Sequence, residues 1–175
     1  EGALSVGSLA FVPTVLHDRF GLPLTQAGGI LAMFALGGLA FSRSAALVLR
    51  RFDPPAQARL AALPLAVGFA MLAAMPHWSW ALAACALAGY GFYALHNTLQ
   101  LTGTQLSTSS RGLAMSLFAG ALFVGQAVGV VLAAMLFARL GSAWTFALAG
   151  TGLTLLPLLF SARLRQRAVS SLTAP

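Results

Sequence analysis

Long apolar runs separated by short polar turns fill almost the whole chain, and this alternation most limits what the chain can fold into. The sequence has 175 residues, of which 59% are hydrophobic and 7% are charged. A soluble domain carries about 25% charged residues, so this chain cannot cover itself with a hydrated surface. Because backbone groups in lipid must be bonded within the protein, and because the runs suit helices in length, we predict an all-α membrane protein.

Six apolar runs are long enough to be considered as membrane spans, since a helix needs about 20 residues to cross the hydrocarbon layer. They cover residues 1–16, 27–42, 57–75, 80–104, 112–138 and 144–162. The first run is short, so we expect its helix to begin upstream of Glu1, which would place Glu1 just inside the membrane edge. The six spans form one predicted domain, 1–162, followed by a basic tail, 163–175.

The arginines are distributed unequally between the two ends of these spans. When the loops are assigned alternately to two sides, one side receives Arg43, Arg50, Arg51, Arg59, Arg111, Arg163, Arg165 and Arg167. The other side receives only Arg19 and Arg139. The positive-inside rule makes the arginine-rich side cytoplasmic, so we expect both termini of this chain in the cytoplasm. The arginines follow apolar runs and form no basic face, which favours the lipid bilayer as their partner over nucleic acid.

A polar stripe crosses the apolar run 80–104. His96, Gln100 and Thr104 recur every four residues, which places them on one helix face, with Asn97 beside them. Polar groups at membrane depth are costly unless they face a partner helix or a water-filled cavity. Two interpretations remain open: these side chains line a solute pathway, or they bond to neighbouring helices and fix the packing. The imidazole is also a candidate proton carrier, because histidine changes charge near neutral pH.

Two further polar residues lie in predicted spans. Gln126 sits inside the run 112–138 and either lines the pathway or forms an interhelical hydrogen bond. Gly125 and Gly129 flank it on a ridge of small residues that predicts close helix packing, with sliding contact as an additional role. Glu1 is the one acid expected within the bilayer. It is a candidate for proton coupling, or alternatively an interfacial acid at a helix end.

The remaining candidates are charged loop residues. We predict that Arg50, Arg51, Asp53 and Arg111 set the membrane topology, with a cytoplasmic gate as an alternative role. The sequence contains no GxxxxGK[ST] phosphate-binding loop, no HExxH and no CxxC pair. Acids are too few for a Ser–His–acid set. We therefore predict no enzyme activity, no catalytic residues, no metal and no cofactor.

The segment GFYALHNTLQLTGTQLSTSSRGLAMSLFAGALFVGQAVG at 91–129 resembles the tenth and eleventh helices of major facilitator superfamily transporters, in the bacterial drug- and sugar-efflux-like branch. FALGGLAFSR…LRRFD at 34–53 resembles a degenerate form of that superfamily's loop motif, with Ser42 near the place of an Asp and Asp53 near the place of a Gly. The resemblance covers nearly the whole chain as a C-terminal six-helix half. It implies twelve helices, a central cavity and alternating access.

On these grounds we predict that the chain is half of a secondary transporter integral to the cytoplasmic, or inner, membrane. The expected activity is transport of a small solute, most simply as proton-coupled efflux. Its expected partners are the small-molecule substrate, the bilayer and a missing N-terminal six-helix half of the same protein. The alternative is a non-transporting six-helix membrane fragment or assembly subunit.

Overall fold

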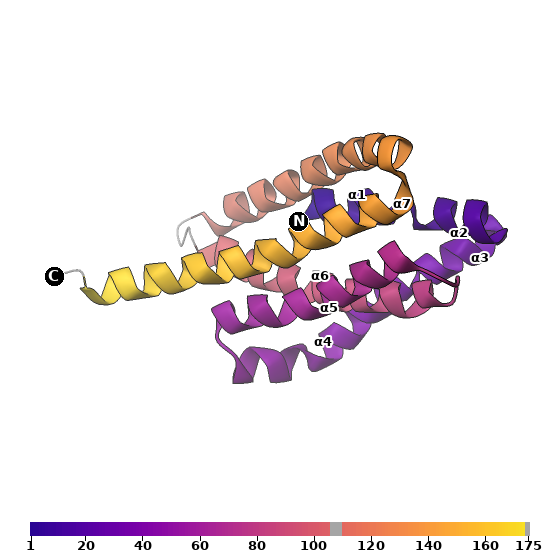
Figure 1. The fold of residues 1–175 in the computed structure, drawn as a ribbon. Helices are drawn as coiled ribbons and strands as arrows, with labels where there is room; N and C mark the ends of the chain where they lie inside the picture. Colours follow the sequence, from indigo (N-terminus) through magenta and orange to yellow (C-terminus); the bar gives the residue numbers. More distant parts are fainter. Residues whose placement is uncertain (106–109, 174–175) are drawn as a thin grey trace.

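The computed structural model describes the backbone of residues 1–105 and 110–173, and the side chains of residues 1–104 and 110–166. Within these ranges the fold is all-helical, as predicted, and the helices run roughly along one common direction (Figure 1). They are α1 (Gly2–Leu9), α2 (Val12–Phe20), α3 (Leu24–Leu31), α4 (Met33–Arg51), α5 (Pro54–Ala74), α6 (Trp80–Gln105) and α7 (Arg111–Thr173). The Ser/Thr-rich loop predicted between α6 and α7 lies largely outside the described residues.

Three helical stretches are long and apolar enough to cross a membrane. They are Leu24–Arg51, Pro54–Ala74 and Arg111–Gln166. The third has 56 residues, which as a straight helix would measure roughly 84 Å and exceed the bilayer several-fold. It is divided at Gly141, whose φ of 80° and ψ of 176° are not helical, and α7 folds back there (Figure 1). We call residues 111–140 the first arm of α7 and residues 142–173 the second arm.

The helix boundaries differ from the predicted spans at the outer end of the first run. A single helix was expected over residues 1–16, but α1 ends at Leu9 and α2 continues to Phe20. Pro13 explains the interruption, because proline has no N–H to donate to the carbonyl four residues earlier. α2 then ends at Gly21, which adopts a left-handed conformation with φ of 67°.

The second predicted span, 27–42, corresponds to α3 and the first part of α4. α4 continues past residue 42 to Arg51, and its end is set by the prolines that follow. Asp53 precedes Pro54 and is extended, as the residue before a proline prefers. Pro54 and Pro55 follow the end of α4 and also form the first turn of α5. The Asp53 Oδ1 accepts a hydrogen bond from the Ala56 N–H at 3.0 Å and so caps α5.

The basic tail does not begin a separate segment, because α7 continues through residue 162 to Thr173. At the centre of the molecule, α6 packs along α4 and along α5, and α5 packs in turn along α7. α1 also packs on α7, against both of its arms. The completely buried side chains of Leu65, Phe69, Leu95 and Phe146 belong to the core that joins these helices.

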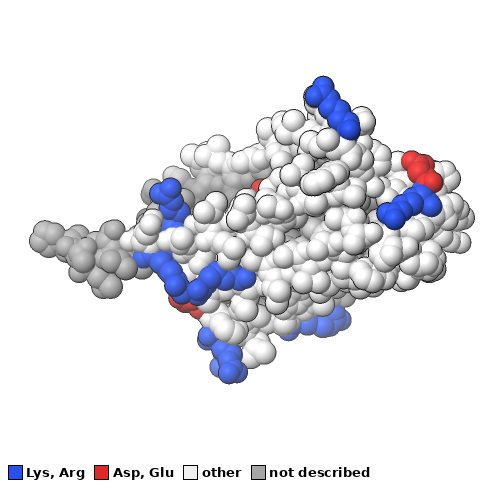
Figure 2. Space-filling model, in the orientation of Figure 1, with Lys and Arg blue, Asp and Glu red and all other residues white. Residues whose placement is uncertain are grey.

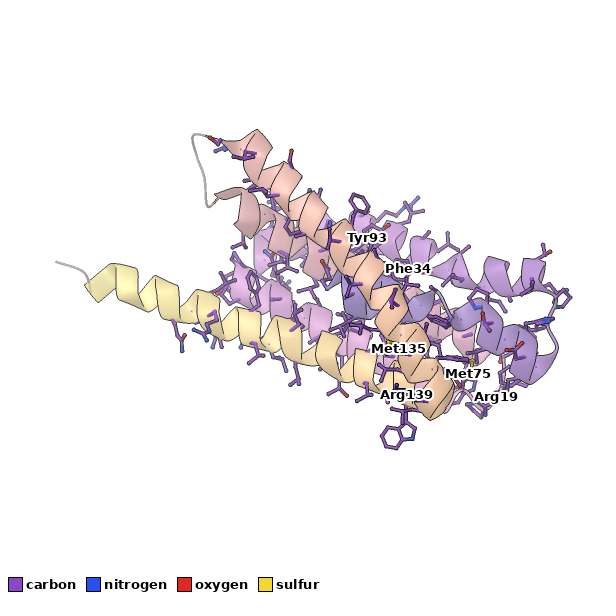
Figure 3. The ribbon with its side chains drawn as sticks, turned by 90° about the horizontal axis from the view of Figure 1, so that it is seen from above. Arg19, Phe34, Met75, Tyr93, Met135 and Arg139 are labelled. Atoms are coloured by element: carbon purple, nitrogen blue, oxygen red, sulfur yellow. The ribbon has the colours of Figure 1, made fainter. Side chains whose placement is uncertain are left out.

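The outer surface is apolar in its middle and charged toward its ends. Large side chains such as Leu117, Phe123 and Val124 are about two-thirds exposed on the first arm of α7. In Figure 2 most of the visible Lys and Arg atoms gather toward one end of the molecule, beside a broad uncharged surface. Figure 3 places Arg19 and Arg139 in the half of the bundle away from the C-terminus. An apolar surface of this extent is suited to lipid rather than to water.

Candidate functional site

The candidate site lies where the beginning of α1 meets α6 and the first arm of α7. Glu1 and His96 are in direct contact there, with 3.0 Å between the carboxylate Oε2 and the imidazole Nδ1. The side chain of Glu1 is only 5% exposed and that of His96 is 20% exposed. The contact is an ion pair when the imidazole is protonated, and a hydrogen bond from Nδ1–H to the carboxylate when it is neutral. Two candidates that are 95 positions apart in the sequence therefore form one unit.

Two phenylalanines hold the imidazole in place. Phe92, one helical turn earlier on α6, stacks on it with 5.5 Å between ring centroids and 15° between ring planes. Phe118 on the first arm of α7 approaches it at 5.3 Å. Offset and tilted ring contacts of this kind fix orientation as well as adding stability. The acid–imidazole pair is therefore enclosed by hydrocarbon, where charge interacts more strongly than in water.

Two buried polar atoms at and beside this pair have no hydrogen-bond partner. They are the second carboxylate oxygen of Glu1, Oε1, and the side-chain Nδ2 of Asn97, the residue that follows His96. An unsatisfied buried polar atom costs about 1–3 kcal/mol, so natural proteins retain few of them. The Glu1–His96 pair therefore has one open acceptor, and α6 has one open donor at the position that follows His96.

The pair lies deeper in the molecule than the sequence suggested. Gly2 packs against the first arm, and a Cβ added to it would lie 2.7 Å from the Leu122 carbonyl oxygen and 3.0 Å from the Cγ of Gln126. Leu122 follows Arg111 by 11 residues, or roughly 16 Å along a helix axis. Glu1 therefore lies beside the middle of the first arm rather than near its end, and Figure 1 marks the N-terminus halfway along the bundle.

The other predicted pathway residues divide into two groups. Gln126, half-buried, lies beside Gly2 and so belongs to the same region as Glu1 and His96. The Gln100 Nε2 points across to the first arm and reaches the Met115 Sδ at 3.8 Å, a weak interhelical contact. Thr104, although on the same stripe, donates to the Leu101 carbonyl of its own helix at 2.9 Å.

The two candidate glycines mark a close approach between α1 and the first arm. A Cβ added to Gly129 would overlap the backbone of Ala3, whereas one added to Gly125 would meet the Ala3 nitrogen at 3.6 Å, an ordinary contact. Gly129 also faces Gly7, so the backbones nearly touch at that level. Both glycines thus lie in a helix-packing contact, and the tighter of the two is Gly129.

The charged loop candidates do not gather at the Glu1–His96 pair. Arg50, Arg51, Asp53 and Arg111 are all exposed, and the Asp53 carboxylate caps α5. Among the described residues the sole ion pair is that of Glu1 and His96. The described side chains therefore provide no salt-bridged gate cluster. Nor do they place three or more His, Cys, Asp or Glu side chains where they could hold a metal ion.

Some residues of the site were not anticipated from the sequence. Phe92 and Phe118 looked like ordinary apolar residues, although Phe92 stands one turn before His96 on the same face. The pairing of Glu1 with His96 had no local signal at all. Comparisons of the chain with protein-family models, with curated protein sequences and with solved structures find no match. Function must therefore be argued from the chemistry of the site itself.

Proposed function

We propose that this chain is one half of a secondary transporter that moves a small solute across the inner membrane by alternating access, coupled to protons. The observation that carries the proposal is the enclosed Glu1–His96 contact in the middle of an apolar helical body. Ionisable side chains at such a depth are costly, and they mark proton and solute pathways in membrane proteins. The major-facilitator-like pattern at residues 91–129 supports the same proposal.

The proposed membrane arrangement has six crossings. Two come from the arms of α7 on either side of Gly141, and one each comes from α5 and from α3 with α4. α6, with 26 residues, is also long enough to cross, and its polar stripe lowers its hydropathy. α1 and α2 supply the sixth crossing on either side of their break, together with residues that we propose lie upstream.

Proton coupling follows from counting the charge of the site. With a neutral imidazole, the Glu1–His96 pair carries one negative charge that is almost fully removed from solvent. One added proton makes the pair neutral, either as an ion pair or as two uncharged groups. A buried charge of this kind is costly unless something neutralises it, which favours a role of the pair in proton coupling.

The solute would be recognised by groups that carry no formal charge. The amides of Asn97 and Gln126 offer both donors and acceptors, and the Asn97 Nδ2 is still without a partner in the described structure. The backbones of α6 and of the first arm make few contacts, so this region can widen without breaking a tightly packed interface. An upstream six-helix half would complete the cavity.

Cysteine labelling tests this proposal without knowledge of the solute. In the full-length protein carrying Cys85→Ala, Asn97→Cys and Gln126→Cys are treated with a membrane-impermeant maleimide in vesicles of both orientations. We expect both positions to react. Leu95→Cys, completely buried two residues before Asn97, and Val124→Cys, on the outer face of the first arm, are the matched controls and are expected to stay unlabelled.

The coupling is tested in the same vesicles. Collapse of the proton gradient with an ionophore should change the labelling rate at Gln126→Cys several-fold when Glu1 is present, and should have no effect in a Glu1→Gln background. If Asn97→Cys and Gln126→Cys are as inert as Leu95→Cys in every condition, the region is packing and the alternative of an assembly subunit is favoured.

A further inference from the structure

A hollow lies between α4 and α5. α4 and α5 both pack along α6, but they scarcely touch each other, and a cavity of about 490 Å³ remains between them with α6 as its floor. This volume is within the range of about 300–1,000 Å³ typical of ligand sites. Its walls include Phe41, Val48, Leu60, Pro64, Leu87 and Ala94.

The polar groups around this groove are already bonded within the protein. The Tyr90 hydroxyl lies 2.9 Å from the Ser44 Oγ, and the buried Gln57 donates from Nε2 to the Phe52 carbonyl oxygen at 2.8 Å. The Thr98 Oγ1 donates to the Ala94 carbonyl oxygen at 3.0 Å. The groove therefore presents hydrocarbon to its occupant, and an apolar chain fits it better than a polar solute.

Positive charge stands at one end of the groove. Arg51 follows the lining residue Val48 by three positions, which places it one helical turn further along the same side of α4. Arg59 precedes the lining residue Leu60 on α5 and donates from Nε to the Pro55 carbonyl oxygen at 3.4 Å. Arg51 has no ion-pair partner among the described residues.

We propose that this groove holds one acyl chain of an anionic phospholipid whose phosphate is bound by Arg51, with Arg59 nearby. Guanidinium groups bind phosphate with two parallel hydrogen bonds, and each basic residue near an anionic headgroup adds about 1 kcal/mol. The hydrocarbon walls bind the acyl chain and the arginines bind the headgroup, so one ligand accounts for both the apolar groove and the charge at its end. This inference rests on the membrane setting of the proposed function and not on transport.

Native mass spectrometry of the detergent-purified, full-length protein tests the site. The protein is titrated with a phosphatidylglycerol and, separately, with the phosphatidylcholine that has the same acyl chains. We expect phosphatidylglycerol to bind at least fivefold more tightly. Arg51→Gln should weaken phosphatidylglycerol binding about fivefold, the equivalent of one lost arginine contact. Arg43→Gln should change it less than twofold, because Arg43 lies five residues before Val48, about 140° around the helix.

A second pair of variants tests whether the chain enters the groove. Leu60→Trp places an indole at a half-exposed lining position and should weaken phosphatidylglycerol binding several-fold. Leu63→Trp adds the same indole to α5 at an exposed residue outside the groove and should leave binding unchanged. Equal binding of the two lipids, equal losses in Arg43→Gln and Arg51→Gln, or equal effects of the two tryptophans would each overturn the proposal.

The outcome separates this site from the transport proposal. Selective lipid binding together with inert cysteines at Asn97 and Gln126 would leave the lipid site standing and remove the transport pathway. Labelled cysteines together with unselective lipid binding would support the transport pathway and remove the lipid site. Protein that stays dispersed without detergent would remove the membrane setting on which both depend.

Discussion

Helix α6 meets α4 backbone to backbone, whereas it meets α1 and the first arm of α7 through side chains. On the α4 side, a Cβ added to Gly37 would overlap the Ala86 carbonyl oxygen, and one added to Gly89 would overlap the backbone of Phe34. The Tyr93 side chain lies against Gly38, and the centroid of its ring is 6.0 Å from that of Phe34. Figure 3 labels both rings. Contacts between small residues let helices approach closely in membranes and leave no room for water.

On the opposite side, the contacts are made by longer and more polar groups. Glu1 reaches His96, Gln100 reaches Met115, and Phe118 lies against the imidazole. The backbones stay apart there, so side chains fill the space between them. The contrast teaches that the polar stripe of α6 lies on its loosely packed side, while the glycines lie on its closely packed side.

The largest expected effect is on the closely packed side. Gly37→Ala should lower the free energy of unfolding by about 3 kcal/mol or more, because the added methyl meets backbone of α6 that cannot move aside. Unfolding of the purified protein in detergent, followed by circular dichroism, measures the loss.

Gly120→Ala is the matched control for this change. It adds the same methyl to an exposed helical position with nothing within 4 Å, and should be neutral or slightly stabilising, since alanine favours helix over glycine. If both substitutions are tolerated equally, α4 and α6 are not held at backbone distance and the contrast between the two sides fails.

The sequence predicts the helices better than it predicts the site. Apolar runs, proline pairs and glycine turns act locally, so the helical segments and the fold-back near residue 141 were anticipated. The break at Pro13 was missed because residues 1–16 were treated as one uniform apolar run. The Glu1–His96 contact depends on how α1 packs against α6, which no local pattern encodes.

The second-largest loss of stability is expected on the side of α6 that faces α1 and the first arm of α7. It should be smaller than the loss in Gly37→Ala. His96→Ala removes the partner of a carboxylate that is 5% exposed, and it also removes two ring contacts, so we expect a loss of about 2 kcal/mol. This is below the 3–5 kcal/mol typical of broken buried ion pairs, because the His96 side chain is 20% exposed and the pair is not fully buried. Denaturant unfolding in detergent gives the value.

Glu1→Gln is the companion variant. The amide can still accept from the imidazole, so we expect a stability loss below about 1 kcal/mol, together with loss of the response to the proton gradient. A Glu1→Gln protein that is as unstable as His96→Ala would show that the pair serves structure. A stable variant that has lost coupling assigns it to proton transfer.

The smallest expected effect on stability is again on the side of α6 that faces α4. A side-chain hydrogen bond there adds little to the close packing at the glycines. Tyr90→Phe removes the hydroxyl that lies 2.9 Å from the Ser44 Oγ, and Ser44→Ala removes its partner. We expect a double-mutant coupling of about 0.6 kcal/mol, the average for polar contacts between membrane helices. The same unfolding assay measures all four proteins. A coupling above about 2 kcal/mol would mean that side-chain bonding, and not backbone approach, holds α4 to α6.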